Sequence, residues 1–530
     1  MTGLRPTARV ARGATYLFAQ GFSNAIIGLV YFVFLAHAFS DPSEQWQMGA
    51  FALLSFILSL AQVFGPLALP SAAIKYIAQY VAEGDLEKAR AVVARVLQVG
   101  LLASTVAFLA LFIPAEWVST LIFNTDQNVL LIRLVAVCSI FVILNGEVSS
   151  FLQGMQKMRD VAIIGLVYSM VSTSLGIYLL LLGWRLYAVV FGWLAGWVIS
   201  SVAGLILTVK YLNISGKPHP IGPLLKFSLP LYVSGGIGLF VSWIDQLLLV
   251  SYMTLLYGTT EAQTILGIYY VAIRASTVPG LFSSALILAL FPQLTELYAQ
   301  QGINSLKDAF RVSTRYSLLI GFPLIVGVAT LAYPTIILFA GSQYIEAVEP
   351  LIIISISAIV GTVGVSIGPI LLTLERTRIA SVLSVVSVSI SFLLSYFALA
   401  YLGLGMTGTA WARTIASIIV LALSLYVLSR HISISIDREA IVKASVASAF
   451  MVLAILSLDL MRKFVSTNYQ FLVIRLTQLP IYVLFGGSAY LLSLVALRAI
   501  KKRDIELIEE YLPQSLKRVV AWLERFAVAD

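Results

Sequence analysis

The feature that most constrains this chain is a long series of apolar segments, each long enough to cross a lipid bilayer. A spanning helix needs about 20 apolar residues, and its backbone groups must be hydrogen-bonded internally because lipid offers no partners. A transmembrane barrel would show alternating polarity, whereas these segments are continuously apolar. Only 11% of the 530 residues are charged and 60% are hydrophobic, which excludes a water-soluble globule. The sequence therefore predicts an all-α polytopic membrane protein.

The placement of charges supports a count of about fourteen transmembrane helices. With the N-terminus inside, most Lys and Arg residues fall in inner loops, and an even count places both termini on the cytoplasmic side of the cell membrane. The first apolar stretch is too long for a cleaved signal peptide and is expected to be a retained span. The predicted spans are 13–38, 47–69, 92–113, 129–151, 161–183, 187–209, 227–250, 264–290, 315–333, 350–373, 379–402, 407–428, 440–460 and 471–497.

Few charges lie inside the predicted spans, and most of them are arginines. A charge at the bilayer centre costs about 2.5–3.5 kcal/mol on insertion scales, so each such residue is by default a functional-site hypothesis. Arg95, Arg315 and Lys443, at the starts of their spans, count with the adjoining inner loops. The other arginines are Arg133, Arg274, Arg413 and Arg475, and the acids are Asp245, Glu147 and, near the end of its span, Asp459.

Two distant stretches resemble each other, which indicates an internal repeat. LPSAAIKYIAQYVAEGDLEKARAVVAR (69–95) is similar to ALFPQLTELYAQQGINSLKDAFRVSTR (289–315), and Arg95 matches Arg315. The offset covers six spans, so both copies would have the same orientation in the membrane. This predicts parallel repeats related by an axis along the membrane normal.

A second pair of stretches supports the repeat, since LQGMQKMRD (152–160) parallels LLTLERTRI (371–379). The tail after the last span has apolar residues at helical spacing with basic residues opposite, which predicts an interfacial amphipathic helix. The predicted domains are an N-terminal six-helix lobe (1–226), a C-terminal six-helix lobe (227–430), two additional transmembrane helices (431–500) and an amphipathic tail (501–530).

Three stretches of the chain together resemble a known family. They are LQGMQKMRD after the fourth span, FSLPLYVSGGIGLFVSWIDQLLL in the seventh and LGIYYVAIRASTVPGLFSSALILALFPQLTELYA in the eighth. The chain looks like a member of the multidrug/oligosaccharidyl-lipid/polysaccharide exporter superfamily, in its polysaccharide flippase branch. The resemblance implies two six-helix lobes around a central cavity that opens alternately to either side. It also implies a polyprenyl-(di)phosphate-linked oligosaccharide as cargo, moved from the cytoplasmic to the outer leaflet.

This cargo class gives the intramembrane arginines a role. Arginine offers planar, permanently charged donors that match phosphate oxygens. We expect Arg274 and Arg413 to contact the phosphate, with Arg133 and Arg475 as weaker candidates that could instead snorkel to the interface. Asp245 is predicted at a depth close to that of Arg274, so these two could also form an ion pair between helices.

Other polar residues are candidates for sugar binding or coupling. Gln20 and Asn24 share one stripe of the first span and could face the cavity or hold helices together. Tyr270 offers an aromatic face to a sugar. Glu147, near the inner end of the fourth span, could be a structural partner or a coupling group.

Two other functions on the same fold stay open, namely a peptidoglycan lipid-precursor flippase and a cation-coupled multidrug antiporter. A membrane glycosyltransferase or polymerase is disfavoured because no loop has room for a catalytic domain, and we expect no enzyme activity. One cysteine and three histidines far apart in sequence predict no metal site, and no cofactor is expected. The expected partners are the lipid-linked oligosaccharide, membrane lipids and glycan-assembly enzymes, with no nucleic acid.

Overall fold

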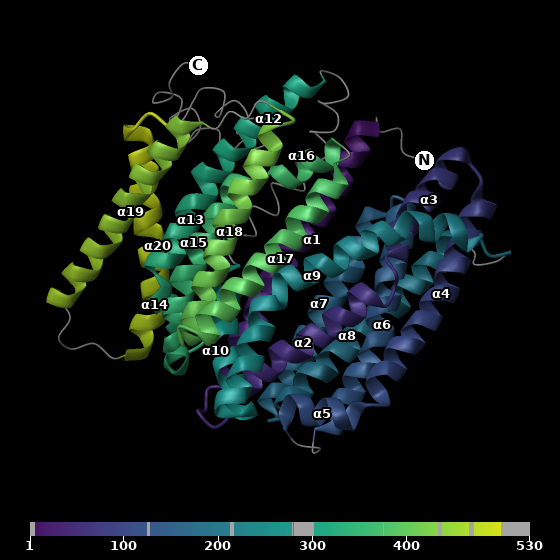
Figure 1. Ribbon diagram of the computed structural model, residues 1–530, viewed down its shortest axis with the longest axis horizontal. Helices are drawn as coiled ribbons and strands as arrows, with labels where there is room; N and C mark the ends of the chain where they lie inside the picture. The colour runs from purple at the N-terminus through teal and green to yellow at the C-terminus, as the bar shows by residue number, and fades with distance from the viewer. Residues whose placement is uncertain are drawn as a thin grey trace. The chain divides into compact units, whose positions relative to one another are not determined.

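In the computed structural model, every regular element of the described residues is a helix (Figure 1). The described residues are 6–124, 128–212, 217–277, 279, 302–374, 376–432, 437–465 and 471–499. The first helices are α1 (Pro6–Ala38), α2 (Trp46–Phe64), α3 (Leu69–Glu83), α4 (Leu86–Phe112), α5 (Ala115–Phe123), α6 (Val129–Gly154), α7 (Met158–Leu181), α8 (Leu186–Tyr211), α9 (Ile221–Tyr257) and α10 (Thr259–Ser276).

The helices after α10 are interrupted more often. Ser317–Gly321 forms a π-helical turn and Ser342–Ala347 a 3₁₀ turn. The α-helices are α12 (Ile303–Tyr316), α13 (Phe322–Thr330), α14 (Ala332–Phe339), α15 (Val348–Gly364), α16 (Ile367–Thr373), α17 (Thr377–Ala400), α18 (Gly405–Ser429), α19 (Arg438–Val465) and α20 (Phe471–Ala496).

The predicted all-α membrane fold is confirmed. Within the described residues, 13 helical segments are long and apolar enough to cross a membrane. They correspond to the predicted spans except 264–290, of which α10 covers the first part and 280–290 lie outside the described residues. The repeat stretch before 302 and the predicted tail helix also lie outside them.

One span is longer than predicted. The seventh was expected at 227–250, but α9 runs for 37 residues from Ile221 to Tyr257. At 1.5 Å per residue its length is about 55 Å, well beyond the hydrocarbon thickness of about 30 Å. The helix extends past both apolar boundaries. Pro223 is tolerated because it lies in the first turn, where its missing N–H would have no intrahelical partner, and Pro230 removes one further backbone donor.

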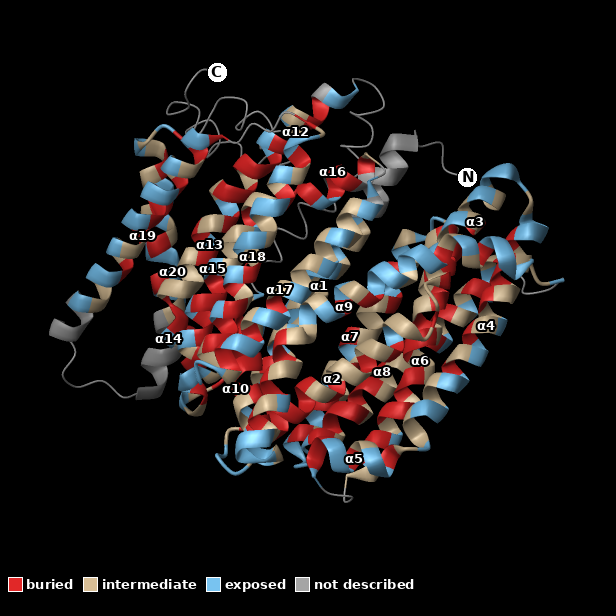
Figure 2. Cartoon of the chain, in the orientation of Figure 1, coloured by how far each residue is buried: buried red, intermediate tan, exposed pale blue. Residues whose placement is uncertain are grey.

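The helices have both buried and exposed faces (Figure 2), and many of the exposed residues are large and apolar. On α4, Leu102 is 67% exposed and Leu101 and Val106 are also exposed, whereas Val93 and Val96 on its other side are fully buried. Exposed leucines would be costly in water but match the hydrocarbon of a bilayer. The described chain is therefore a multi-pass membrane protein.

The described chain divides into two compact units. Unit 1 contains Met1–Val271, Phe339–Gln343 and Ser384–Ala412, and unit 2 contains the rest. The units do not follow the predicted lobe boundary at 226/227, since α9 groups with the helices before it. The two units are defined by contacts between helices, whereas the lobes were predicted from the sequence repeat. The units therefore do not test the lobes, which remain a prediction.

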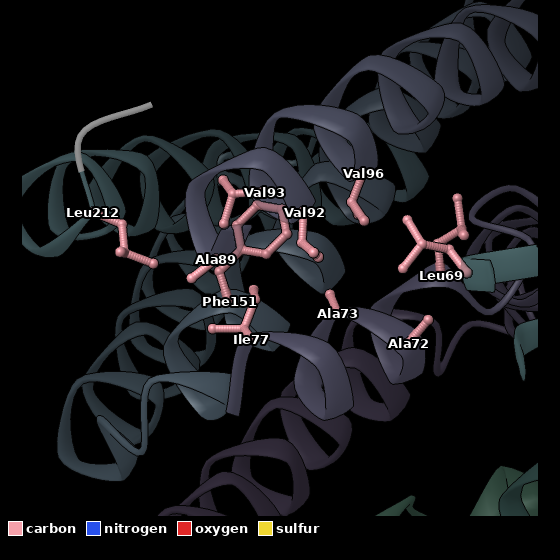
Figure 3. Packing of buried hydrophobic residues seen from close by; sticks show 11 residues of the cluster. Leu69, Ala72, Ala73, Ile77, Ala89, Val92, Val93, Val96, Phe151 and Leu212 are labelled. Carbon is pink, nitrogen blue, oxygen red and sulfur yellow. The ribbon is translucent and has the colours of Figure 1, made fainter. Parts of the chain in front are cut away.

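Unit 1 contains an apolar cluster, shown in Figure 3. It joins α3, α4 and α6 through side chains such as Ala73, Val93 and Phe151, all fully buried. The turn between α3 and α4 is made by Gly84, whose φ of 79° favours glycine, and by Asp85, whose carboxylate accepts the Lys88 backbone N–H at the start of α4. The amphipathic stretch of the repeat thus becomes a helical hairpin.

In unit 2, α19 and α20 pack against α13 through a cluster of their own. Its buried members include Met451 and Ile455 on α19, Tyr482 and Tyr490 on α20, and Leu331 beside α13. The Tyr490 hydroxyl donates a hydrogen bond of 2.7 Å to the carbonyl of Leu319, inside the π-helical turn. A π turn leaves a backbone carbonyl without its usual donor, and in lipid such a group is costly. The Tyr490 hydrogen bond therefore links α20 to the π-helical turn before α13.

Candidate functional site

The two arginines predicted to contact phosphate both belong to unit 2. Arg274 lies in the last turn of α10 with an exposed side chain. Arg413 lies on α18 with a half-buried side chain, and its backbone carbonyl accepts a hydrogen bond of 2.9 Å from the Ser417 hydroxyl. Neither side chain is fully buried in a packed core.

Asp245 is buried on α9 in unit 1, with 1% of its surface exposed. The hydroxyl of Tyr269, from α10, donates a hydrogen bond of 2.9 Å to its Oδ2 atom. This bond satisfies part of a carboxylate that would be expensive to leave unpaired in a membrane. The predicted pairing of Asp245 with Arg274 stays a prediction.

Tyr270 is part of an aromatic cluster at the α2–α9–α10 contact of unit 1. Its ring centroid lies 5.8 Å from that of Phe51 in an edge arrangement and 6.3 Å from that of Trp243 in a stacked one. Phe32 of α1 adds a further ring at 6.4 Å. Tyr270 is only 2% exposed, so in this conformation its faces contact protein rather than space open to a sugar.

The polar stripe on α1 contacts α7. The Ser169 hydroxyl donates a hydrogen bond of 2.9 Å to Oδ1 of Asn24. The amide of Gln20 occupies the space that a Cβ on Gly165 would fill, and Tyr31 lies similarly against Gly176. Gln20 and Asn24 thus contact the neighbouring helix, which is one of the two roles that the sequence left open. The other role, lining a central cavity, stays a prediction.

Arg133 and Arg475 were the weaker candidates. Arg133 is exposed near the start of α6, with Nη2 3.8 Å from Oε1 of Glu116 and its guanidinium over the ring of Phe112 at 5.3 Å. Charge pairing at the end of a span is the geometry expected of a snorkelling side chain. Arg475 lies on α20, but its side chain is outside the described residues.

Glu147 is fully buried on α6 and faces α4. A Cβ on Gly100 would overlap both carboxylate oxygens, so the glycine provides the notch in which the carboxyl lies. Neither oxygen has a hydrogen-bond partner among the described residues. No group of three His, Cys, Asp or Glu side chains suited to a metal ion occurs within that part of the chain either.

Sequence reasoning found Arg95 and Arg315 as matched repeat positions but did not predict their partners. Arg95 Nε donates a hydrogen bond of 2.6 Å to the carbonyl of His219, 124 residues away. Arg315 Nη1 donates one of 3.1 Å to Oδ2 of Asp437, 122 residues away. Both partners lie in the segment that leads out of a repeat into the next long helix. The matched arginines were the available signal, but sequence spacing could not reveal which residue each one reaches.

A close backbone approach in unit 1 was also missed. A Cβ on Gly49 of α2 would overlap the carbonyl oxygen of Gln263 on α10, and a Cβ on Gly267 would lie 2.9 Å from the Gly49 nitrogen. The Gln263 side chain donates to the Ile122 carbonyl in the last turn of α5. Small residues permit this contact, which joins α10 to α2 and α5.

The fold is shared with solved transporters. The lipid II flippase MurJ, in an inward closed conformation, superposes with a TM-score of 0.67 at 18% identity, covering 90% of this chain and 97% of that chain. An outward-facing multidrug resistance MATE family transporter of the MOP superfamily gives 0.62 at 15% identity, covering 80% and 95%. These likenesses establish that the chain has the all-α fold of these solved transporters.

Sequence relatives agree with this fold. The chain is 23% identical over 448 residues to the probable low-salt glycan biosynthesis flippase Agl15 of Haloferax volcanii, covering 83% of this chain and 88% of that protein. The family model described as polysaccharide biosynthesis protein matches residues 45–349, more than half of the sequence, and the chain belongs to that family.

Proposed function

We propose that this protein is a flippase that moves a polyprenyl-(di)phosphate-linked oligosaccharide from the cytoplasmic to the outer leaflet by alternating access. The family match carries this proposal, because it joins polysaccharide biosynthesis to a fold shared with a lipid flippase and a transporter. No enzymatic step is required, since the cargo changes leaflet without changing bonds. Both termini lie on the cytoplasmic side in this proposal, in agreement with the basic inner loops.

The proposed cargo contact consists of arginines in an otherwise apolar setting. A lipid phosphate that leaves water needs replacement donors, and a guanidinium provides several in a fixed plane. Arg274 is exposed on α10 and Arg413 half-buried on α18, so both side chains can reach a ligand. Asp245 and its Tyr269 partner would help to position α9 and α10, which carry the stretches of sequence that resemble the flippase family.

Enzymes of glycan assembly would supply the cargo on the cytoplasmic side and extend or transfer it on the other. This part of the proposal follows from the cargo alone, because a lipid-linked oligosaccharide must be made before it is moved.

The test is reconstitution of the full chain in vesicles with a fluorescent lipid-linked oligosaccharide. A membrane-impermeant quencher or reductant then reports the fraction of label on the outer leaflet over time. Accelerated exchange relative to protein-free vesicles supports the proposal. Parallel vesicles with the peptidoglycan lipid precursor, or with a cationic drug and an ion gradient, test the two rival cargos. Exchange of the precursor alone, or drug efflux alone, would replace the proposal with that rival.

A further inference from the structure

We infer that Glu147 is a proton-binding site whose ionisation is linked to the separation of α4 from α6. This goes beyond the proposed function, because it concerns a buried carboxyl in unit 1 and holds whatever the cargo is. The argument begins with the surroundings of the carboxyl. Its residue has 0% of its surface exposed, and both oxygens lack a hydrogen-bond partner among the described residues.

The carboxyl lies between apolar layers of the unit. One turn further along α6, Phe151 belongs to the buried cluster with Val93 and Val96 of α4, visible in Figure 3. One turn before it, Ile143 contacts the position of Gly65. At 1.5 Å per residue, Glu147 is about 10 Å along the helix axis from the C-terminal end of α6 at Gly154. Water reaches this place only if the helices around it move apart.

No charged partner from the neighbouring helices is bonded to this carboxyl. On α4 the charged residues end at Arg95, which is bonded to the His219 carbonyl, and α2 has none. Lys75 lies in the middle of α3 with its ammonium over the rings of Tyr76 and Phe227. The other charged residues on helices packed against α6 lie in the outer turns of those helices, and Arg133 of α6 itself is paired with Glu116. Besides Arg95, the charged and titratable groups on these helices are Lys75, Tyr76, Tyr80 and Glu83 on α3, Glu87, Lys88 and Arg90 on α4, Glu116 on α5, Arg159, Asp160, Tyr168 and Tyr178 on α7, and Tyr187, Lys210 and Tyr211 on α8.

An ionised carboxylate in this setting would have neither solvent nor a counter-charge. Burying such an ion costs several kcal/mol even after relaxation, so the closed packing of α4 on α6 is compatible with the protonated form. Conversely, loss of the proton is favoured only when the carboxyl gains water. Ionisation and opening of this helix contact are therefore thermodynamically linked.

The predicted repeat has no acid at the matching position of its second copy. The alignment of 152–160 with 371–379 places Glu147 opposite Ser366, an uncharged residue that is also fully buried. The carboxyl and its Gly100 notch are thus features of one copy. A purely structural filler of this position would be cheaper as an uncharged side chain, which favours a role that uses the proton.

The direct test reads the carboxyl itself. Infrared difference spectra of the full chain in lipid, recorded across a pH titration, should contain a protonated-carboxyl band that is absent from Glu147→Gln. Glu116→Gln, which removes an exposed carboxylate at the outer surface, is the matched control and should leave the band in place. If the band is the same in Glu147→Gln, Glu147 does not hold the proton and the inference is wrong.

The linkage to helix opening is tested by hydrogen exchange of α4 and α6, compared as protection factors so that the intrinsic pH dependence of exchange cancels. In the wild type, protection around Gly100 should fall ~10-fold or more as the carboxyl ionises, equivalent to about 1.4 kcal/mol. In Glu147→Gln it should stay constant with pH. Equal pH profiles in the two proteins would overturn the linkage.

A second variant covers the case in which Glu147→Gln does not fold. Gly100→Ala fills the notch with a methyl group that only the flexible carboxyl needs to avoid. The displaced carboxyl should ionise in a different pH range, seen as a shifted infrared band and a shifted exchange transition. An unchanged titration in Gly100→Ala would contradict the notch as the proton site. Neither readout uses the cargo, so this inference and the flippase proposal can fail separately.

Discussion

Arg315 and Asp437 form a buried ion pair in unit 2, with 3.1 Å between Nη1 and Oδ2 and less than a tenth of either side chain exposed. Arg315 also donates a hydrogen bond of 2.7 Å to the carbonyl of Ala499, just after α20. Asp437 caps α19 by accepting the Ala440 backbone N–H. One arginine therefore holds both ends of the α19–α20 hairpin against α12.

Breaking this pair should loosen the α19–α20 hairpin. Asp437→Asn keeps an oxygen for the cap but removes the charge, leaving the Arg315 guanidinium buried without its counter-ion. Loss of one partner of a buried pair typically costs about 3–5 kcal/mol. The thermal unfolding midpoint of the detergent-solubilised protein, together with proteolysis of the hairpin, should report this loss.

Arg311 provides the matched control for that experiment. Its Nε atom lies 4.0 Å from the same carboxylate, but its side chain is 52% exposed. Exposed pairs contribute about 0–1 kcal/mol, so Arg311→Met should change the midpoint little. A loss in Arg311→Met equal to that in Asp437→Asn would show that the hairpin does not depend on Arg315.

The same carboxylate predicts a pH dependence of hairpin docking. Burial raises the pKa of Asp437, but the hydrogen bonds from Ala440 and Arg315 and the charges of Arg315 and Arg311 outweigh it, so the pKa lies below its ordinary value. A carboxyl with a lowered folded-state pKa stabilises the fold above its unfolded-state pKa and loses that effect as pH falls through the folded-state pKa. The wild type should therefore exceed Asp437→Asn in stability at neutral pH, with the difference shrinking in acid. Thermal unfolding of both proteins as a function of pH measures it, and a difference that grows in acid would contradict the assignment.

The fold was predictable because the membrane imposes it. Apolar length sets each span, so thirteen of the fourteen predicted spans correspond to helices, and the family resemblance is confirmed by the family match. The π turn at Ser317–Gly321 was not predictable, and its Leu319 carbonyl accepts a hydrogen bond from Tyr490, which lies far along the chain.

The candidate site was less predictable than the fold, because its side chains contact residues that lie far away in the sequence. Charge inside a span identified Glu147 and Asp245 as unusual, but only the structure shows that Gly100 faces the first and Tyr269 the second. From the sequence, Gln20 and Asn24 on α1 could equally line a cavity or contact another helix, since both roles need polar residues at helical spacing. Side-chain partners over long separations decide such cases.

Gly49 should tolerate no side chain. A methyl group there would overlap the Gln263 carbonyl oxygen, a backbone atom that cannot rotate away. Overpacking of this kind costs about 1–3 kcal/mol, so Gly49→Ala should lower the thermal unfolding midpoint. Gly28→Ala on α1 is the control, because nothing lies within 4 Å of its added Cβ, and it should be neutral or slightly stabilising. Equal behaviour of the two variants would show that α2 and α10 do not approach as described.

Removal of the proposed phosphate contacts should stop transport without unfolding the protein. Arg274→Ala and Arg413→Ala each delete charge-assisted hydrogen bonds worth about 1.5–3 kcal/mol, which corresponds to ~10-fold to ~100-fold slower leaflet exchange if they act on the barrier. Lys at either position should restore part of the rate, because it keeps the charge but not the planar donor pair. The fluorescent lipid-linked oligosaccharide assay measures these rates, with the thermal unfolding midpoint as a check on folding.

Arg133→Ala is the matched control, since Arg133 is also an arginine within a span but is exposed and paired with Glu116 near the end of α6. Its exchange rate should stay within about twofold of the wild type, in line with the small energies of exposed pairs. If Arg274→Ala and Arg413→Ala transport at the rate of Arg133→Ala, the cargo phosphate is bound elsewhere. If all three lose transport together with their unfolding midpoints, the arginines stabilise the helices, and the phosphate contact must be assigned to other residues.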